Sequence, residues 1–279
     1  MKKLIRFLLI IILTLVLLVV YARYGGTRGL ITKEYKIETS IDDSFDGLKI
    51  VHFSDLHYLR IMNKETTKSV IDEINLLKPD IVVFTGDLID KDYKPTDKDI
   101  SNLKELFTGI KSKYGKYSVL GEHDVKLDDS IKEIYKDSNF ILLDNSYDII
   151  YGNNNDMLFI GGLSNNSDID KVMNYFNDND DINYKIILVH EPDYTDTITS
   201  KYDNINLILS GHSHNGQINI PYIKKLFLPS GSKKYYDNYY NINNTNLYIS
   251  SGIGEENINF RLFNKPSINF YRINKIETK

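Results

Sequence analysis

The chain has 279 residues, of which 42% are hydrophobic and 26% charged, a balance that excludes wholesale disorder and predicts a buried core. The formal net charge of −4 supplies no overall positive field, which argues against nucleic acid as a partner. Cysteine is absent, so disulfides, thiolate metal sites and cysteine nucleophiles are excluded, and any metal must be held by nitrogen and oxygen.

The amino-terminal segment predicts a membrane helix. An uncharged apolar run covers residues 7–22 and follows the positive residues Lys2, Lys3 and Arg6. Positive charge on this side favours a cytoplasmic amino terminus, a single pass through the cell membrane and an extracytoplasmic catalytic domain. A cleaved signal peptide is the alternative, although no small-x-small cleavage site is clear. We therefore interpret residues 1–23 as a membrane anchor.

The remainder of the chain predicts a linker followed by one domain of catalytic size. We assign the linker and an entering strand to residues 24–47, with the strand at 35–38, and the domain to residues 48–279. Short runs rich in Ile, Val and Leu predict further buried strands. These strands are expected at 48–53, 81–84, 117–120, 157–160, 185–189, 206–209 and 247–249.

Helical periods lie between several of these strands. Apolar residues recur on one face of residues 70–77 and of residues 100–110, and Pro79 ends the first of these helices. The alternation of strands and helices predicts an α/β domain with a largely parallel component and crossover connections. Hairpins, and therefore mixed sheets, are also expected at 141–143, 148–151 and 157–160.

Five of the six histidines follow directly after apolar strands. They lie in the turns Ser54–His57, Gly121–Asp124, Val189–Glu191 and Gly211–His214, and a further turn, Thr85–Leu88, carries a carboxylate instead. Ligands of open α/β sheets bind at the carboxyl ends of strands, so these side chains can converge on one site. Imidazole and carboxylate suit divalent Mn, Fe or Zn, and their supply exceeds the needs of one ion. We therefore predict two adjacent divalent metals, about 3.5 to 4 Å apart.

Several neighbouring residues leave alternatives open. A single strand-end histidine is more often structural than functional, and only the set of five turns changes that judgement. His52 lies within a predicted strand, so we expect it to be a core or supporting residue. Asp90 and Asp124 either orient metal ligands or are surface carboxylates in turns. Residues 233–246, rich in Tyr and Lys, form either a flap or an ordinary surface loop, and we favour the loop.

In order and spacing these turns resemble the calcineurin-like metallophosphoesterases. The residues that carry the resemblance are Asp55-Leu56-His57, Gly86-Asp87, Gly121-Glu122-His123-Asp124, His190 and Gly211-His212-Ser213-His214. The turn at 247–254 and the tail at 261–266 look like the membrane-anchored or exported branch, which includes proteins similar to UDP-2,3-diacylglucosamine pyrophosphatases. The resemblance implies a four-layer α/β/β/α sandwich with mixed sheets, here preceded by one transmembrane helix.

Carried over by position, the resemblance also implies a role for each site residue. Asp55, His57 and His214 would hold the first metal, while Asp87 would bridge both. His190 and His212 would hold the second metal, together with Glu122. The family usually has Asn at the position of Glu122, and a carboxylate brings a different charge to the site. His123 would contact the phosphate and assist departure of the leaving alkoxide.

These observations predict a dinuclear metal-dependent phosphoesterase that hydrolyses a phosphomonoester, phosphodiester or pyrophosphate bond at the membrane. Its substrate would be a small-molecule, lipid-linked or nucleotide-sugar phosphate. A metal-binding sensor or scaffold of the same fold, with weak or no turnover, is the second hypothesis because of Glu122. A nuclease is disfavoured by the net charge and the anchor.

Overall fold

The computed structural model describes residues 1–164, 169–177 and 182–276. Two six-stranded sheets lie face to face. The first contains, in spatial order, β1 (Ile31–Thr39), β12 (Ser267–Lys275), β2 (Leu48–Phe53), β3 (Ile81–Phe84), β4 (Gly115–Ser118) and β5 (Ile141–Leu142). The second contains β10 (Tyr239–Ile242), β11 (Thr245–Ile249), β9 (Leu207–Ser210), β8 (Tyr184–Val189), β7 (Met157–Leu163) and β6 (Ser146–Tyr151).

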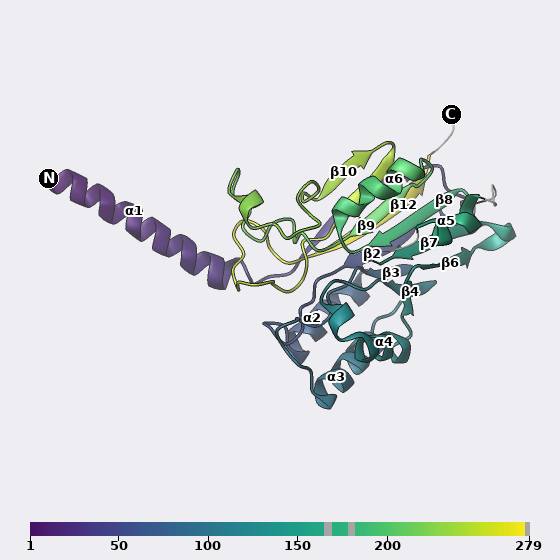
Figure 1. Cartoon of the computed structure of the whole chain (residues 1–279), viewed down its shortest axis with the longest axis horizontal. Coiled ribbons are helices and arrows are strands. Elements are labelled where there is room, and N and C mark those ends of the chain that lie inside the picture. Colours follow the sequence, from purple (N-terminus) through teal and green to yellow (C-terminus); the bar gives the residue numbers. More distant parts are fainter. Residues whose placement is uncertain (165–168, 178–181, 277–279) are drawn as a thin grey trace.

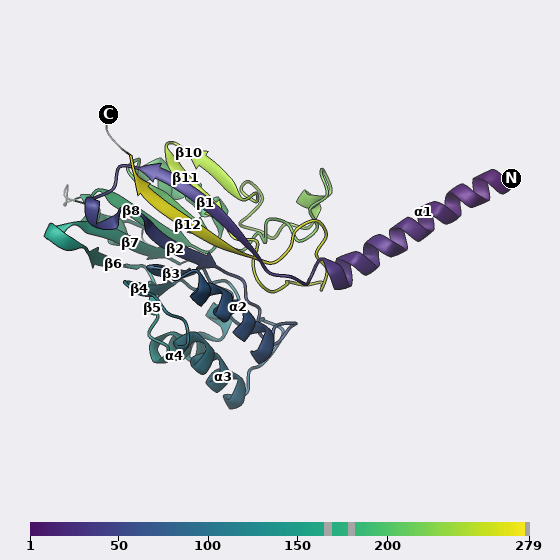
Figure 2. The same ribbon diagram turned by 180° about the vertical axis from the view of Figure 1, so that it is seen from behind.

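Helices cover both outer faces of this sandwich (Figure 1, Figure 2). The α-helices are α1 (Lys2–Val20), α2 (Lys64–Leu76), α3 (Asp97–Thr108), α4 (Asp128–Asp137), α5 (Ile169–Asn177) and α6 (Thr195–Lys201). The shorter helices are η1 (Tyr21–Gly25), η2 (Asp43–Phe45), η3 (Asp124–Lys126), η4 (Asn153–Asn155), η5 (Pro192–Tyr194) and η6 (Lys224–Leu226). Helices α2 to α4 lie on the first sheet, and α5 and α6 lie on the second.

Three hydrophobic layers hold the sandwich together, because successive strand residues point to opposite faces of each sheet. In β2, Val51 and Phe53 pack against the helices, whereas Ile50 faces the second sheet. On the second sheet, Ile186 faces inward and Ile187 packs under α5 and α6. The predicted four-layer α/β/β/α architecture with mixed sheets is therefore confirmed.

The strand directions bring the carboxyl ends of the central strands to one edge. Strands β2, β3 and β4 are parallel, as are β7, β8, β9 and β11. Strand β12 is parallel to β1 and antiparallel to β2, with Ser267 opposite Ile31 and Asn269 opposite His52. The start of β1 therefore lies at the same edge of the sheet as the end of β2.

Three parts of the strand prediction differ from the structure, the first being residues 239–242, which form β10 within the stretch that we expected to be a surface loop. Strands β6 and β7 form the expected antiparallel hairpin, but residues 141–142 are wrong as a hairpin arm, because β5 pairs in parallel with β4 in the other sheet. Strand β12 was not expected from the sequence, since polar residues interrupt its apolar pattern. One of them, Asn269, is fully buried, and its side-chain amide donates to the hydroxyl of Tyr271 at 3.0 Å.

The helix at the amino terminus extends away from the sandwich (Figure 1). Residues Lys2–Gly25 form a helix long and apolar enough to cross a membrane, which fits a single-pass anchor. The end of this helix packs on the domain, because the carbonyl of Ala22 accepts a hydrogen bond from the backbone amide of Arg261 at 2.9 Å. A Cβ on Gly26 would lie 1.7 Å from the Arg261 carbonyl oxygen, so only glycine permits this approach. Ala22, which lies near the end of the predicted anchor, is thus part of the contact.

Candidate metal centre

Two groups of possible metal ligands meet at the carboxyl ends of β2, β3, β8 and β9. The first group is Asp55, His57 and His214, and the second is Asp87, His190 and His212. Within each group, one ligand atom per residue lies within 4.8 Å of the others. All six residues are buried. The structure thus brings together six of the seven side chains that we predicted as metal ligands.

Asp87 lies between the two groups. Its Oδ2 atom is 3.3 Å from Nε2 of His190 in the second group and 3.9 Å from Nε2 of His57 in the first. Its Oδ1 atom accepts a hydrogen bond from the backbone amide of His123 at 2.9 Å. One oxygen of this carboxylate therefore faces both groups, while the other fixes the following turn.

The ligand turns bend sharply, with several residues in the left-handed region that non-glycine residues rarely adopt. The residues with positive φ are Asp55 (51°), His57 (44°), Asp87 (60°), His212 (65°) and His214 (48°). Each such residue costs roughly 1–2 kcal/mol, so the surrounding fold has to hold these turns in place. The close packing of these turns also requires glycine at position 121, because a Cβ there would lie 2.1 Å from Oδ1 of Asp87.

Asp124 is one of the residues that hold these turns. Its carboxylate accepts hydrogen bonds from the backbone amides of Asp87 and Leu88, both at 2.8 Å, and of Gly121 at 2.9 Å. Asp90 lies 3.5 Å from Nδ1 of His57 and accepts a hydrogen bond from Arg60. Both aspartates are fully buried, so the alternative that they are surface carboxylates is wrong.

The histidines leave unpaired nitrogens where a cation would need them. Nδ1 of His190 hydrogen-bonds the carbonyl of Thr85 at 2.6 Å, and Nε2 of His212 hydrogen-bonds the carbonyl of Ser230 at 2.5 Å. The other ring nitrogen of each is buried and has no hydrogen-bond partner among the described residues. A histidine that binds a metal through one ring nitrogen characteristically donates a hydrogen bond from the other ring nitrogen to a carbonyl or carboxylate. These donor atoms therefore fit a divalent cation held by nitrogen and oxygen.

The electrostatics of the two groups differ. Burial raises the pKa of Asp87, but the neighbouring imidazoles, His190 first, outweigh burial and hold that pKa well below its usual range. Burial lowers the pKa of His214 to about 3, so this imidazole is neutral at ordinary pH. A neutral imidazole and an ionised carboxylate are the forms that bind metals.

His123 lies beside the two groups, with three carboxylates around it. Its Nε2 atom is 3.4 Å from Glu122, 3.7 Å from Glu256 and 3.9 Å from Asp87. Burial opposes a positive charge here, but these carboxylates outweigh it and raise the pKa of His123 to about 10. The position and charge of this imidazole suit contact with an anionic group.

Comparisons with known proteins agree with this arrangement. Residues 48–216 match the family model described as calcineurin-like phosphoesterase. The chain belongs to this family. It is 32% identical over 260 residues to the metallophosphoesterase YkuE of Bacillus subtilis, covering 91% of this chain and 88% of that protein. It is 25% identical to a Danio rerio transmembrane protein with a metallophosphoesterase domain, covering 92% of this chain and 61% of that protein.

The phosphoesterase is therefore a metal-dependent hydrolase of phosphoesters, as the sequence predicts. The metallophosphoesterase YkoQ of Bacillus subtilis is a further relative, 27% identical over 94% of this chain and 99% of that protein. The narrower likeness to UDP-2,3-diacylglucosamine pyrophosphatases stays a prediction, as do the individual roles of the site residues.

Glu122 occupies a different place from the other predicted ligands. Its carboxylate is half-exposed and groups with Glu191 and His212, and separately with His123 and Glu256. It lies outside the group formed by Asp87, His190 and His212. Glu122 therefore adds negative charge at the side of the phosphoesterase site that His123 and His212 share.

Sequence reasoning missed Glu256 and Lys91. Glu256 is almost fully buried, and its carboxylate accepts a hydrogen bond from Nζ of Lys91 at 3.2 Å. Glu256 follows the turn after β11, so it occupies a strand-end position like the predicted ligands. A search of strand-end turns for carboxylates as well as histidines would have found it. Lys91 also follows a strand end, since it lies in the segment after β3.

The tail at 261–264 forms hydrogen bonds around the turn that carries His214. The guanidinium of Arg261 is fully buried, and its Nη2 atom donates to the carbonyls of Ser251 at 2.9 Å and Gly254 at 2.6 Å. The same nitrogen lies 3.3 Å from Nδ1 of His214. The amide of Asn264 donates to the carbonyl of His214 at 2.5 Å. The tail thereby supports the site from the side where α1 ends.

We predict that Glu122→Asn improves the binding of dianionic phosphomonoesters relative to monoanionic diesters. The substitution removes one negative charge beside His123, which reduces repulsion of the more highly charged substrate. Because the carboxylate is partly exposed to solvent, the ratio of the two KM values should change by only about twofold to fivefold. Steady-state kinetics on both p-nitrophenyl esters measures this ratio. Glu133→Gln, on the exposed face of α4, is the control, and an unchanged ratio in Glu122→Asn would show that this carboxylate points away from substrate.

Proposed function

We propose that the chain is a two-metal phosphoesterase that acts on lipid-linked phosphate at a membrane surface. One divalent cation of the Mn, Fe or Zn class would be held by Asp55, His57 and His214. A second would be held by His190 and His212, with Asp87 shared between the two. The observation that carries this proposal is the single Asp87 oxygen that faces both histidine groups at 3.3 and 3.9 Å.

The chemistry divides between the cations and the chain. When bound, two divalent cations supply positive charge and Lewis acidity at the phosphoryl group. His123 would contact a phosphate oxygen and donate a proton to the departing alkoxide, because its surrounding carboxylates favour the protonated imidazole. Asp124 and Arg261 would hold the turns that carry Asp87 and His214. Glu122 would ligate the second cation from outside the group of Asp87, His190 and His212, through its proximity to His212, as the family position implies.

The direction of the strands supports a site close to the membrane. The anchor ends where β1 begins, and that edge of the sheet is also where β2 delivers Asp55 and His57. One residue links the two features directly: the backbone amide of Arg261 bonds Ala22 at the end of the anchor, and its side chain reaches His214. The positive residues before the anchor favour a catalytic domain on the extracytoplasmic side.

The cavity beside the site combines polar and apolar residues, which favours an amphipathic substrate. It has a volume of about 180 Å³, and its lining includes His214 and Glu256 as well as Phe227 and Ile258. Phe227 belongs to a loop whose neighbours Tyr222 and Leu226 are also strongly exposed. This loop lies on the side of the domain from which α1 leaves (Figure 1). A phosphate held at the cations could thus keep its apolar part toward the bilayer.

A metal-binding sensor with weak turnover is the second candidate, favoured by the carboxylate of Glu122 in place of the family's Asn. The two candidates share the ligand set and differ in catalysis. Hydrolysis of bis-p-nitrophenyl phosphate by the full chain with added Mn²⁺ separates them. Metal binding without turnover above the uncatalysed rate would favour the sensor.

We expect Asp87→Ala to be the most damaging single change in the site. It removes the carboxylate that faces both histidine groups and leaves the histidines without its negative charge. Metal content, measured by elemental analysis after gel filtration, should fall, and turnover should fall by several orders of magnitude. Asp144→Ala, at an exposed position, is the control. Two bound metals and near-normal turnover in Asp87→Ala would contradict the assignment.

His123→Ala should separate catalysis from metal binding. We expect unchanged metal content and a decrease in kcat of about 10² to 10⁴, the range for removal of a general acid or a charge-stabilising donor. The decrease should be smaller for esters of p-nitrophenol, which leave without a proton, than for alkyl esters. Equal losses on both kinds of ester would exclude proton donation and leave electrostatic contact alone.

Phe227→Asp should test the lipid-linked substrate. It places a charge in the exposed apolar loop, so hydrolysis of a long-chain alkyl phosphodiester in vesicles should slow while hydrolysis of bis-p-nitrophenyl phosphate in solution stays unchanged. The matched control is Tyr151→Asp, an exposed aromatic residue on β6 at the far edge of the second sheet. Parallel loss of both activities in Phe227→Asp, or loss of neither, would contradict the role given to this loop.

A further inference from the structure

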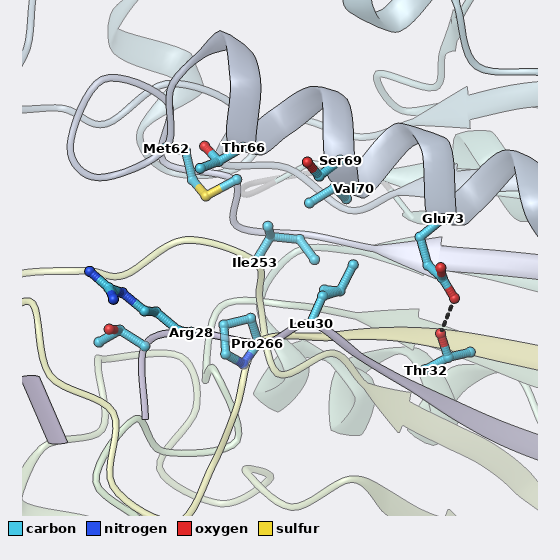
Figure 3. Close-up of a pocket in the computed structure, with 12 residues that line it drawn as sticks. Arg28, Leu30, Thr32, Met62, Thr66, Ser69, Val70, Glu73, Ile253 and Pro266 are labelled. Carbon is cyan, nitrogen blue, oxygen red and sulfur yellow. Dashed lines mark hydrogen bonds between the residues drawn. The ribbon is translucent and has the colours of Figure 1, made fainter. Parts of the chain in front are cut away.

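A second and larger cavity lies beside the end of the anchor. It has a volume of about 600 Å³ and lies between the segment that precedes β1, helix α2 and the turn at 252–254 (Figure 3). Leu30, Val70 and Ile253 give it an apolar interior, with Met62 and Pro266 nearby. None of the proposed metal ligands lines this cavity.

Two cations lie at one end of this cavity. Arg28 is exposed and lines it, and Nζ of Lys265 lies 3.3 Å from the position that a Cβ on Gly29 would take. Neither side chain has a hydrogen bond or ion pair with any other residue that the structure describes. The one acidic lining residue, Glu73, accepts a hydrogen bond from Thr32 at 3.2 Å and lies at the opposite side of the cavity from Arg28 (Figure 3).

The cavity lies next to the end of the membrane-length helix. Its lining begins with Thr27 and Arg28, which follow the membrane-length helix ending at Gly25 within a few residues. An apolar interior with unpaired cations at this place matches a molecule that has an acyl chain and an anionic headgroup. Polar side chains such as Thr66 and Ser69 also line the cavity, so its wall as a whole is amphipathic, like such a molecule.

We propose that this cavity binds an anionic phospholipid of the membrane that holds α1. The headgroup phosphate would contact Arg28 and Lys265, and an acyl chain would lie against Leu30, Val70 and Ile253. This binding goes beyond the proposed hydrolysis, since it requires neither metal nor turnover, and it rests only on the membrane position of α1.

The cavity also adjoins the metal centre through one short turn. The backbone amide of Ile253 donates to the carbonyl of Ser54 at 3.0 Å, and that of Gly254 donates to the carbonyl of Asp55 at 2.7 Å. A lipid packed on Ile253 would therefore stabilise the conformation of the turn that carries Asp55.

The absence of tryptophan from the chain allows a direct test. Ser69→Trp places a single fluorescent reporter among the residues that line the cavity, and Lys68→Trp places a matched reporter on the preceding residue of α2, which is exposed but does not line the cavity. The full chain would be placed in nanodiscs of phosphatidylcholine and phosphatidylglycerol, with bromine on the acyl chains of the phosphatidylglycerol. We expect strong quenching of the reporter at 69 and little at 68. Equal quenching at both positions, or none at 69, would overturn the proposal.

Charge reversal then tests the headgroup contact. Arg28→Glu and Lys265→Glu, each in the Ser69→Trp background, should weaken binding of brominated phosphatidylglycerol by about fivefold per cation. Lys98→Glu on α3 is the control and should leave the quenching unchanged. Unaltered quenching in the Arg28 and Lys265 variants would overturn the headgroup assignment. Relief of quenching by millimolar glycerol phosphate would identify a soluble anion as the ligand and overturn the lipid.

Discussion

The buried carboxylate of Asp87, placed between the imidazoles of His57 and His190, is the interaction on which the rest of the site depends. A carboxylate without solvent requires compensating positive charge, and the two histidine groups with their unpaired nitrogens are arranged to share that charge with cations. The strained backbone at Asp55, Asp87 and the other ligands persists only because rigid strand ends and the carboxylate of Asp124 hold the turns. Stability of the sandwich and chemistry of the site are thus linked through the same few backbone amides.

The second constraint is the placement of that site relative to the anchor. Strand β12, parallel to β1 and antiparallel to β2, brings the end of the anchor and the ends of the strands that carry the candidate ligands to one edge of the sheet. Arg261 joins them, because its backbone contacts Ala22 and its side chain contacts the carbonyls around His214. An apolar loop at Phe227 and an apolar cavity at Leu30 lie on the same side. A soluble substrate would not require this arrangement, whereas a lipid-linked phosphate would benefit from it.

The sequence was sufficient to expect mixed α/β sheets and the turns that carry the candidate ligands, because both depend on local patterns, whereas the four-layer sandwich was expected only from the family resemblance. Apolar runs predict strands, and residues directly after parallel strands converge at one edge, so Asp55, Asp87 and His190 could be grouped without a structure. Strand β12 could not be predicted, since its buried Asn269 is accommodated only in the folded chain, where its amide donates to the hydroxyl of Tyr271 in the same strand and to the carbonyl of Ile249 in β11. Glu256 was missed because its turn contains no histidine. The burial of Arg261 could not be predicted either, because three carbonyls of the turn at 251–254 have to accept hydrogen bonds from the guanidinium before it can leave water.

The most direct test of the two-metal site is anomalous X-ray scattering from crystals of the chain grown with Mn²⁺. We predict two peaks in the anomalous difference map, one enclosed by Asp55, His57 and His214 and the other by His190 and His212, with the carboxylate of Asp87 between them. A single peak, or peaks away from Asp87, would contradict the shared-carboxylate arrangement.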